Sequence, residues 1–418
     1  MKAAILSIGD ELLIGQTINT NASYIGNLLT ENQTDIVRSS VIGDDRTEIL
    51  NEFDYCAAKA DAVIVTGGLG PTHDDITRSC ILEYFSASLI KDERVYQDIA
   101  ERFARLNRVL TPLNEDQAMV PESATIMRNL QGTAPGYILK KGNCTFFFMP
   151  GVPSEMKAMM QNYVIPEIIR LRQDTGSYTI MSTLLTTGIP ESVLFQKLGN
   201  LDELLKGNKL AFLPSQFGVK LRITVKAENK SAAQESLIEI EQKIRSVAGR
   251  YIYGKGEESL AEVVGRLLKE RGQTVAVAES CTGGGIANQL TNVAGSSAYF
   301  ERGVVSYSNA AKVEILNVNE DLIMEKGAVS EEVALEMAIG IKAISGSDIG
   351  LSATGIMGPS GGSAEKPVGT VFIGIASQEG SYARHYLMGD NRLLNKDRVI
   401  QAALELLRRH LLGIPFEN

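Results

Sequence analysis

In two separate stretches, the chain alternates short apolar runs with amphipathic segments. In the first stretch, the apolar runs KAAILSIG at 2–9 and DAVIVTGG at 61–68 are separated by helical patterns, and this order continues to about residue 170. In the second stretch, which begins near residue 255, TVAVA at 274–278 and IGLSATG at 349–355 again alternate with helical patterns. Strands that alternate with helices predict a parallel sheet with helices on both faces.

The segment between these stretches has a different pattern. VKLRITVKAE at 219–228 alternates polar and apolar residues, and a single long helix follows it. We expect Ser231 and Gln234 to form a capping box at the start of this helix, and Gly249 to follow its last turn. The pattern predicts a small α+β module.

The length of 418 residues suits about three domains. We place them at 1–172, 173–254 and 255–418, because GKGEES at 254–259 has the composition of a linker. The last domain opens with a predicted capping box of Ser259 and Glu262, on a helix that stops at Gly272. The predicted class is therefore multidomain α/β, with two α/β domains flanking an α+β domain.

The charge and the cysteines exclude several classes of protein. Lys and Arg total 41 against 50 Asp and Glu, and this net charge of -9 argues against nucleic acid or an anionic membrane as a partner. Four cysteines without a CxxC pair, and only three histidines, argue against a zinc site. The acidic pair after residue 9 comes too early for a secretory signal, and no apolar run is long enough for a membrane helix. We expect a cytoplasmic protein.

The strongest motif is AESCTGGG at 278–285, between an apolar strand and a helix. The motif presents Ser280 and Cys281, and the backbone N–H groups of Thr282, Gly283 and Gly284 at a helix N-terminus predict an anion site. Taken alone, the motif is more typical of a tight turn in which Ser280 caps the helix.

Two further polar segments follow strands of the same domain, SYSNAAK at 306–312 and SATGIMGPSGG at 352–362. Loops at the carboxyl ends of neighbouring strands converge, so Ser280, Lys312 and Thr354 are expected to meet. No histidine lies between residues 74 and 384, which leaves a lysine as the candidate base. A free lysine is neutral in about one molecule in 2,500 at pH 7, so burial or a cation such as Arg392 must lower the pKa of Lys312. The alternatives are a surface lysine and, for Tyr307, packing in the core.

The N-terminal domain carries TGGLGPTHDDIT at 66–77, directly after an apolar strand. The segment has no GK[ST] and no GxGxxG, so it is neither a P-loop nor a dinucleotide fingerprint. Its glycines allow close approach of a phosphate, and its two aspartates are candidates for holding a hard cation. Further acidic pairs, at 10–11 and 44–45, also follow apolar runs. The alternative for each acid is a helix cap.

Over essentially its whole length, the chain resembles the CinA family of competence/damage-inducible proteins. The last third is similar to stand-alone nicotinamide mononucleotide deamidases in AESCTGG, GSSAYFERGVVSYSNAAK, GAVSEEVALEMA, TGIMGP and KPVGTV. The first third resembles the family's molybdopterin-binding-like domain in SIGDELLIGQTINTNA, VIGDD, TGGLGPTHDDIT and PGVPSEM. The middle is similar to the family's KH-like domain, but it has no GxxG loop and no basic cluster, so RNA binding is not supported.

For the last domain, the resemblance implies a Ser/Lys amidohydrolase that needs no cofactor. Ser280 would attack the carboxamide of nicotinamide mononucleotide, Lys312 would take its proton, and ammonia would leave. The resemblance also implies supporting residues, which assist catalysis or bind the substrate: Tyr307, Thr354, Thr282, Gly283, Gly284, Gly355 and Arg392. Met357 stands where the family usually has alanine, and one extra residue precedes Arg392.

For the first domain, the resemblance implies cleavage of ADP-ribose to AMP and ribose 5-phosphate with a divalent metal, magnesium or cobalt, and with potassium as a further candidate ion. The implied substrate residues are Gly67, Gly68, Gly70, Thr72 and Thr77, and the implied metal ligands are Asp10, Asp44, Asp74 and Asp75. The resemblance also implies a homodimer, with the KH-like domain in a structural or dimerising role. A non-catalytic protein that binds nucleotides or molybdopterin in a competence or DNA-damage response is the alternative.

Overall fold

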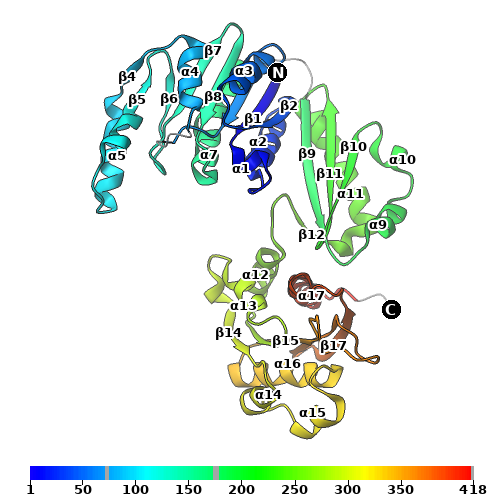
Figure 1. The fold of residues 1–418 in the computed structure, drawn as a ribbon. Helices are drawn as coiled ribbons and strands as arrows, with labels where there is room; N and C mark the ends of the chain where they lie inside the picture. Colours follow the sequence, from blue (N-terminus) through cyan, green and yellow to red (C-terminus); the bar gives the residue numbers. More distant parts are fainter. Residues whose placement is uncertain (71–74, 173–177, 416–418) are drawn as a thin grey trace. The chain divides into compact units, whose positions relative to one another are not determined.

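The computed structural model describes residues 1–70, 75–172 and 178–415, and Figure 1 shows the three domains in chain order. The backbone separates into two compact units, 1–180 with 226–233, and 181–225 with 234–418. We call β1 to α8 the N-terminal domain, β9 to β12 the middle domain, and α12 to α17 the C-terminal domain. The predicted multidomain α/β architecture is confirmed.

The N-terminal domain is built on a six-stranded sheet of order β2-β1-β3-β8-β7-β6. The strands of this sheet are β1 (Lys2–Ile8), β2 (Asp35–Ile42), β3 (Ala62–Thr66), β6 (Thr125–Met127), β7 (Gly136–Lys141) and β8 (Cys144–Met149), and a separate pair joins β4 (Leu89–Lys91) to β5 (Met119–Pro121). The first four strands of the order are parallel, but β7 and β6 are antiparallel. The predicted fully parallel sheet is therefore wrong at this edge, because β7 and β8 form a tight hairpin.

Helices cover both faces of this sheet, as predicted. They are α1 (Asp10–Leu13), α2 (Thr20–Glu31), α3 (Arg46–Ala57), α4 (Thr77–Phe85), α5 (Glu93–Arg105), α6 (Pro112–Glu115), α7 (Pro153–Met159) and α8 (Ile165–Leu171). The central strands are apolar on both sides, so one core packs around Phe53 and Phe146 and the other around Phe147 and Met160.

The middle domain has a four-stranded sheet of order β10-β11-β9-β12. Its elements are β9 (Tyr178–Thr186), α9 (Glu191–Leu198), α10 (Leu201–Leu205), β10 (Lys209–Ser215), β11 (Gly218–Ala227), α11 (Lys230–Ala248) and β12 (Ile252–Lys255). The long helix ends before Gly249 as predicted, but it begins at Lys230, and the side chain of Asn229 accepts a hydrogen bond from the N–H of Ala232 at 3.0 Å. The predicted start at Ser231 is therefore wrong, because an asparagine two residues earlier caps the helix.

The C-terminal domain has a five-stranded sheet of order β14-β13-β15-β16-β17. Its strands are β13 (Val275–Glu279), β14 (Phe300–Val305), β15 (Ile349–Gly355), β16 (Thr370–Ser377) and β17 (Gly380–Leu387), and its helices are α12 (Leu260–Arg271), α13 (Gly285–Thr291), α14 (Asn309–Leu316), α15 (Glu320–Lys326), α16 (Glu331–Ser345) and α17 (Arg392–Leu412). The first three strands of the order are parallel, whereas β16 and β17 are antiparallel. The predicted capping box of Ser259 and Glu262 is confirmed.

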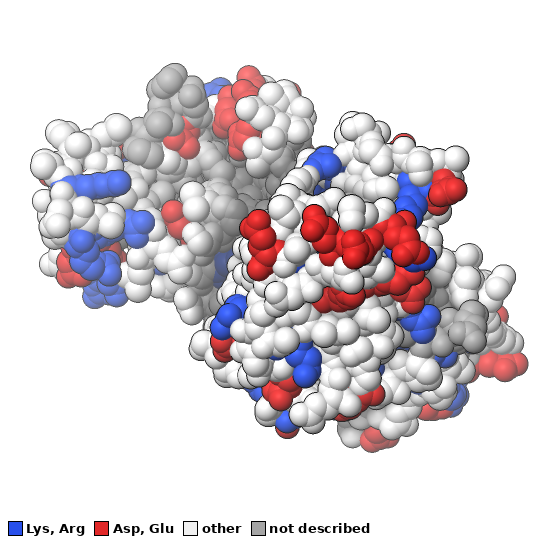
Figure 2. Space-filling view, turned by 90° about the horizontal axis from the view of Figure 1, so that it is seen from below, with Lys and Arg blue, Asp and Glu red and all other residues white. Residues whose placement is uncertain are grey.

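The parallel strands of the C-terminal domain end at one edge of the sheet. Glu279 at the end of β13 pairs with Val305 of β14 and with Ala353 of β15, so the loops that follow these strands begin side by side. One core lies on each face of the sheet. In the described part of the chain, no helix is long and apolar enough to cross a membrane. Figure 2 shows acidic side chains gathered in a band on the face turned to the viewer, with fewer basic ones among them.

Two candidate active sites

Ser280 and Lys312 meet in the C-terminal domain. Ser280 follows β13 directly, and Lys312 lies on the first turn of α14, which Ser308 caps. The Nζ atom of Lys312 is 3.1 Å from the Oγ atom of Ser280, and the two residues are 1% and 8% exposed. Both line a cavity of about 200 Å³. The sequence therefore placed a hydroxyl and an amine together correctly, across 31 intervening residues.

The surroundings of Lys312 combine burial with uncharged hydrogen-bond acceptors. Burial lowers the pKa of Lys312, and Arg392 is not among the causes. In the described part of the chain, no carboxylate forms an ion pair with it; its Nζ atom contacts the backbone carbonyls of Ser306 at 2.9 Å and Tyr307 at 3.3 Å. The Nζ atom also donates to Ser280 Oγ, so loss of one proton from the amine would leave a lone pair within reach of the Ser280 hydroxyl.

Cys281 is the other nucleophilic side chain at this turn. Its thiol lies in the hydrophobic core of the domain, and burial raises its pKa to about 12. Because the thiolate is the reactive form of cysteine, the buried thiol is inert near neutral pH. Ser280 is therefore the candidate nucleophile of the turn.

Part of the predicted anion site at the start of α13 is already occupied, because the protein places its own carboxylate there. The buried side chain of Glu279 accepts hydrogen bonds from the N–H groups of Gly284 at 3.1 Å, Ile286 at 3.0 Å and Ala287 at 2.8 Å. The N–H of Gly283 donates to the carbonyl of Ser280 at 3.2 Å. Ser280 does not cap the helix either. These bonds fix the turn that carries the nucleophile.

Four of the other predicted residues line the same cavity: Tyr307, Thr354, Gly355 and Arg392. The hydroxyl of Thr354 donates to the carbonyl of Ala328 at 2.8 Å. Tyr307 is 64% exposed, which excludes the core-packing alternative, and its hydroxyl lies 3.4 Å from the Nη2 atom of Arg392. Thr282 is buried and does not line the cavity.

The departures from the family pattern are accommodated. Met357 lines the cavity but is buried within the core cluster of the domain. Arg392 begins α17, and its Nη1 atom donates to the carbonyl of Gly358 at 2.9 Å. The extra residue before Arg392 therefore still leaves its guanidinium at the cavity.

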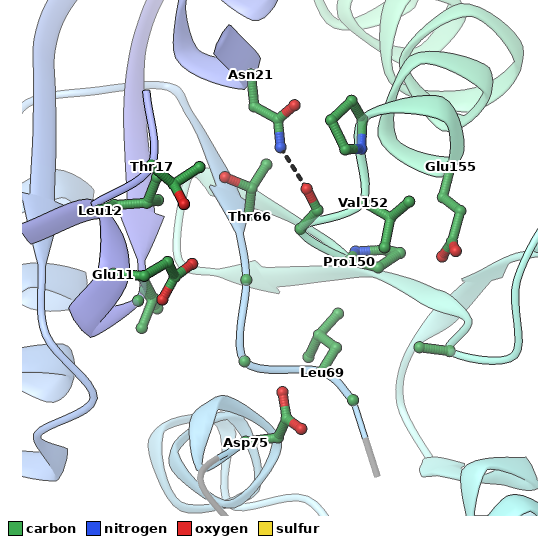
Figure 3. Close-up of a pocket in the computed structure, with 18 of the residues that line it drawn as sticks. Glu11, Leu12, Thr17, Asn21, Thr66, Leu69, Asp75, Pro150, Val152 and Glu155 are labelled. Atoms are coloured by element: carbon green, nitrogen blue, oxygen red, sulfur yellow. Dashed lines mark hydrogen bonds between the residues drawn. The ribbon is translucent and has the colours of Figure 1, made fainter. Parts of the chain in front are cut away.

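A larger cavity, of about 490 Å³, lies in the N-terminal domain at the carboxyl ends of β1, β3 and β8 (Figure 3). Of the predicted residues, those that line it are Gly67, Gly68, Gly70, Asp44 and Asp75. Gly67 has a φ of +107°, and a Cβ atom there would lie 2.1 Å from the carbonyl oxygen of Ile8, so only glycine fits. Thr77 is fully buried behind Gly68 and does not line the cavity. Thr72 and Asp74 lie outside the described residues.

The carboxylates near this cavity have distinct roles. Asp10 and Asp44 join their loops reciprocally: the N–H of Asp44 donates to Asp10 at 3.1 Å, and the N–H of Asp10 donates to Asp44 at 3.2 Å. Asp10 does not line the cavity, whereas its neighbour Glu11 does. Burial raises the pKa of Asp44, and the negative charges of Asp10, Glu11 and Asp75 raise it further. Asp45 caps α3, as the structural alternative predicts.

The described carboxylates do not form a ready-made metal site. Within residues 1–70, 75–172 and 178–415, no group of three histidine, cysteine or acidic side chains is arranged to hold an ion. The acids clustered around Asp44 nevertheless suit a cation, since a positive charge would offset their negative charges.

Sequence reasoning missed three polar residues that line this cavity, Asn21, Gln117 and Glu155. The amide nitrogen of Asn21 donates to the carbonyl of Gly151 at 2.7 Å (Figure 3). The side-chain carbonyl oxygens of Asn21 and Gln117 are buried, and neither has a hydrogen-bond partner among the described residues. Glu155 comes in the segment PGVPSEM, six residues after the end of β8 and already within α7, whereas Asp10 and Asp44 come two residues after their strands; only the acidic residue in a segment after a strand could have pointed to it.

Comparison with known families covers all three domains. "Probable molybdopterin binding domain" matches residues 4–170, "Damage-inducible protein CinA KH domain" matches 181–254, and "CinA C-terminal domain" matches 257–411. A CinA-like protein of Kosmotoga olearia is 41% identical over 414 residues, which cover 99% of this chain and all of the relative. The chain belongs to the CinA family.

A second full-length relative agrees with this assignment. A CinA-like protein of Chloroherpeton thalassium is 43% identical over 98% of this chain and 99% of its own length. Among solved structures, a competence/damage inducible protein from Agrobacterium tumefaciens is 41% identical over 35% of this chain and 91% of its own chain, with a TM-score of 0.35.

Proposed function

We propose that the C-terminal domain hydrolyses the carboxamide of nicotinamide mononucleotide to nicotinate mononucleotide and ammonia. The observation that carries this proposal is the 3.1 Å approach of the Lys312 amine to the Ser280 hydroxyl in a buried cavity. A phosphate-binding pocket needs no such pair, whereas a serine nucleophile needs an adjacent base.

The reaction divides into two steps. In the first, Ser280 Oγ attacks the carboxamide carbon while its proton passes to Lys312 Nζ. The Lys312 ammonium then protonates the amide nitrogen, the C–N bond breaks, and ammonia leaves an ester on Ser280. In the second, Lys312 takes a proton from a water molecule that attacks the ester, and Ser280 regains its proton as nicotinate mononucleotide leaves. The N–H group of Cys281, a residue that lines the cavity, is the candidate for stabilising the oxyanion.

The dimensions of the cavity suit this substrate. A volume of about 200 Å³ is below the usual range of about 300–1,000 Å³ for ligand pockets, so we assign the cavity to the pyridine ring. The ribose phosphate would then extend outward, toward the exposed end of Arg392 beside Tyr307. A guanidinium is a suitable partner for phosphate.

Ammonia release from nicotinamide mononucleotide tests the proposal. We expect release by the wild type and a loss of at least about 1,000-fold in Ser280→Ala. Ser381→Ala, an exposed serine of β17, is the matched control and should keep the wild-type rate. A wild-type protein that binds the mononucleotide but releases no ammonia would favour the non-catalytic alternative.

We further propose that the N-terminal domain hydrolyses ADP-ribose to AMP and ribose 5-phosphate with a divalent metal. Among the described residues, the cavity is lined by the four carboxylates of Glu11, Asp44, Asp75 and Glu155 and by no lysine, arginine or histidine. An anionic diphosphate would be repelled from such walls unless a cation accompanied it. Asp44 and Asp75, together with Asp74, which precedes Asp75 in the sequence, are the residues we assign to magnesium or cobalt, which would neutralise the diphosphate charge.

AMP formation from ADP-ribose tests whether the N-terminal domain is a hydrolase or only binds a pterin or a nucleotide. We expect AMP only when magnesium or cobalt is present, and none after chelation with EDTA. Asp75→Ala should abolish the metal-dependent rate, whereas Asp54→Ala, an acid on α3 outside the cavity, should keep it.

Potassium is tested as an added salt, and size-exclusion chromatography tests the homodimer that we propose for the full chain.

A further inference from the structure

Glu155 stands apart from the other acids of the N-terminal cavity. It lies on α7, and Figure 3 shows its side chain on the side of the cavity opposite Glu11, with Asp75 below. The acids that raise the pKa of Asp44 are Asp10, Glu11 and Asp75, and Glu155 is not one of them. The cavity therefore has a side with clustered acids and a side with one isolated carboxylate.

The isolated carboxylate is held in a fixed orientation. The Nδ2 atom of Asn129 donates to Glu155 Oε2 at 2.7 Å and to the carbonyl of Ala134 at 2.8 Å. The Oδ1 atom of Asn129 accepts from the N–H of Gly132 at 2.8 Å. Gly132 itself lies against the Glu155 carboxylate, where an added Cβ atom would approach to 2.3 Å. The backbone of Gly132 and the side-chain amide of Asn129 thus cover one part of the Glu155 carboxyl group. Glu155 also lines the cavity.

The electrostatic surroundings give Glu155 the affinity for protons that a base requires. Burial raises its pKa above that of a free glutamate, and the hydrogen bond from Asn129 and the charge of Arg102 on α5 offset part of this effect. Among the described residues, no other titratable group contributes to the shift. A carboxylate whose pKa is raised toward neutrality accepts a proton more readily during the reaction.

We propose that Glu155 is the general base of the N-terminal reaction, and that Asn129 is its positioning residue. The inference rests on the ADP-ribose hydrolysis proposed above. Glu155 takes one proton from a water molecule, whose oxygen forms a bond to one phosphorus of the diphosphate. The bond from that phosphorus to the bridging oxygen breaks, and the bridging oxygen leaves on the other phosphate. The clustered acids on the opposite side would hold the cation, whose positive charge would offset the negative charge of the diphosphate.

Glu155→Gln is the central variant, because glutamine keeps both the size of the side chain and an oxygen that accepts from Asn129. We expect its kcat for ADP-ribose, measured with magnesium, to fall by about 100- to 10,000-fold. Binding of AMP by calorimetry and the melting temperature should stay at wild-type values. Glu167→Gln, on α8 and paired with Arg170 outside the cavity, is the matched control and should keep the wild-type kcat.

The pH profile distinguishes a base from a structural residue. The wild-type rate should fall as the pH drops through the pKa of Glu155, and this acid limb should be absent in Glu155→Gln. Asn129→Ala removes a hydrogen bond that lowers this pKa, so its acid limb should move to higher pH. A purely structural role would change neither limb.

The outcomes distinguish a failure of the hydrolase proposal from a failure of the proposed role of Glu155. If the wild type forms no AMP with magnesium or cobalt, the hydrolase proposal and the role of Glu155 are both overturned. If the wild type is active but Glu155→Gln stays within about threefold of it, or keeps the acid limb, the role of Glu155 alone is overturned.

Discussion

Replacing Lys312 by methionine tests whether its amine is the base of the C-terminal reaction. Methionine keeps an unbranched apolar stem in a site that is 1% exposed, and it removes only the atom that contacts Ser280 at 3.1 Å. General-base catalysis contributes about 100- to 10,000-fold, which corresponds to about 3–5 kcal/mol of transition-state stabilisation. We expect kcat for ammonia release to fall by this factor.

The pH dependence and a second variant strengthen this test. Burial lowers the pKa of Lys312, so the wild-type kcat/KM should rise with pH to a plateau that is reached below the pKa of a free lysine, about 10.4. Lys312→Arg keeps a cation that cannot be deprotonated in a protein, and it should lose as much activity as Lys312→Met. Lys326→Met, an exposed lysine of α15, is the control. Activity within about threefold of wild type in Lys312→Met, or an active Lys312→Arg, would refute the base.

Three further substitutions follow from the geometry of the same site. Glu279→Ala leaves three N–H groups without their carboxylate, and we expect a loss of about 2–4 kcal/mol in the free energy of unfolding, measured in urea; an unchanged midpoint would contradict the capping role. Arg392→Ala should raise KM for nicotinamide mononucleotide about tenfold but leave nicotinamide riboside, which lacks the phosphate, unaffected. Cys281→Ala should keep the wild-type rate because the pKa of this thiol is about 12, and inactivation would show that the thiol takes part.

The sequence predicted that Ser280 and Lys312 lie close together. Each of them comes after a strand, and both strands end at the same edge of the sheet. Ser280 follows β13, a continuous apolar strand that is buried on two faces, whereas Lys312 comes after β14, a mostly exposed edge strand that pairs in parallel with β13. The same reasoning brought Gly67 and Asp44 to one cavity. The order of strands and helices determines these positions, and local sequence patterns are enough to predict that order.

What the sequence could not supply depends on where individual side chains point. Glu279 is the last residue of a buried strand, and nothing in its spacing shows that its carboxylate turns back onto α13. Asp10 is next to Glu11, yet only Glu11 lines the cavity, because Asp10 bonds to the loop of Asp44 instead. The edge strand β17 was missed because its alternating polar residues carry a weak signal. Tertiary contacts, rather than local sequence patterns, determine these features.

The internal carboxylate at the start of α13 has a consequence for substrate range. A loop that waits for a ligand's phosphate to order it is reactive only toward phosphorylated compounds, whereas here an acid of the protein itself already neutralises the helix end. The hydroxyl and amine are thus preorganised before anything binds. In the reaction that we propose, recognition of the substrate's phosphate can then change how tightly a pyridine amide binds. It does not determine whether the bound amide reacts.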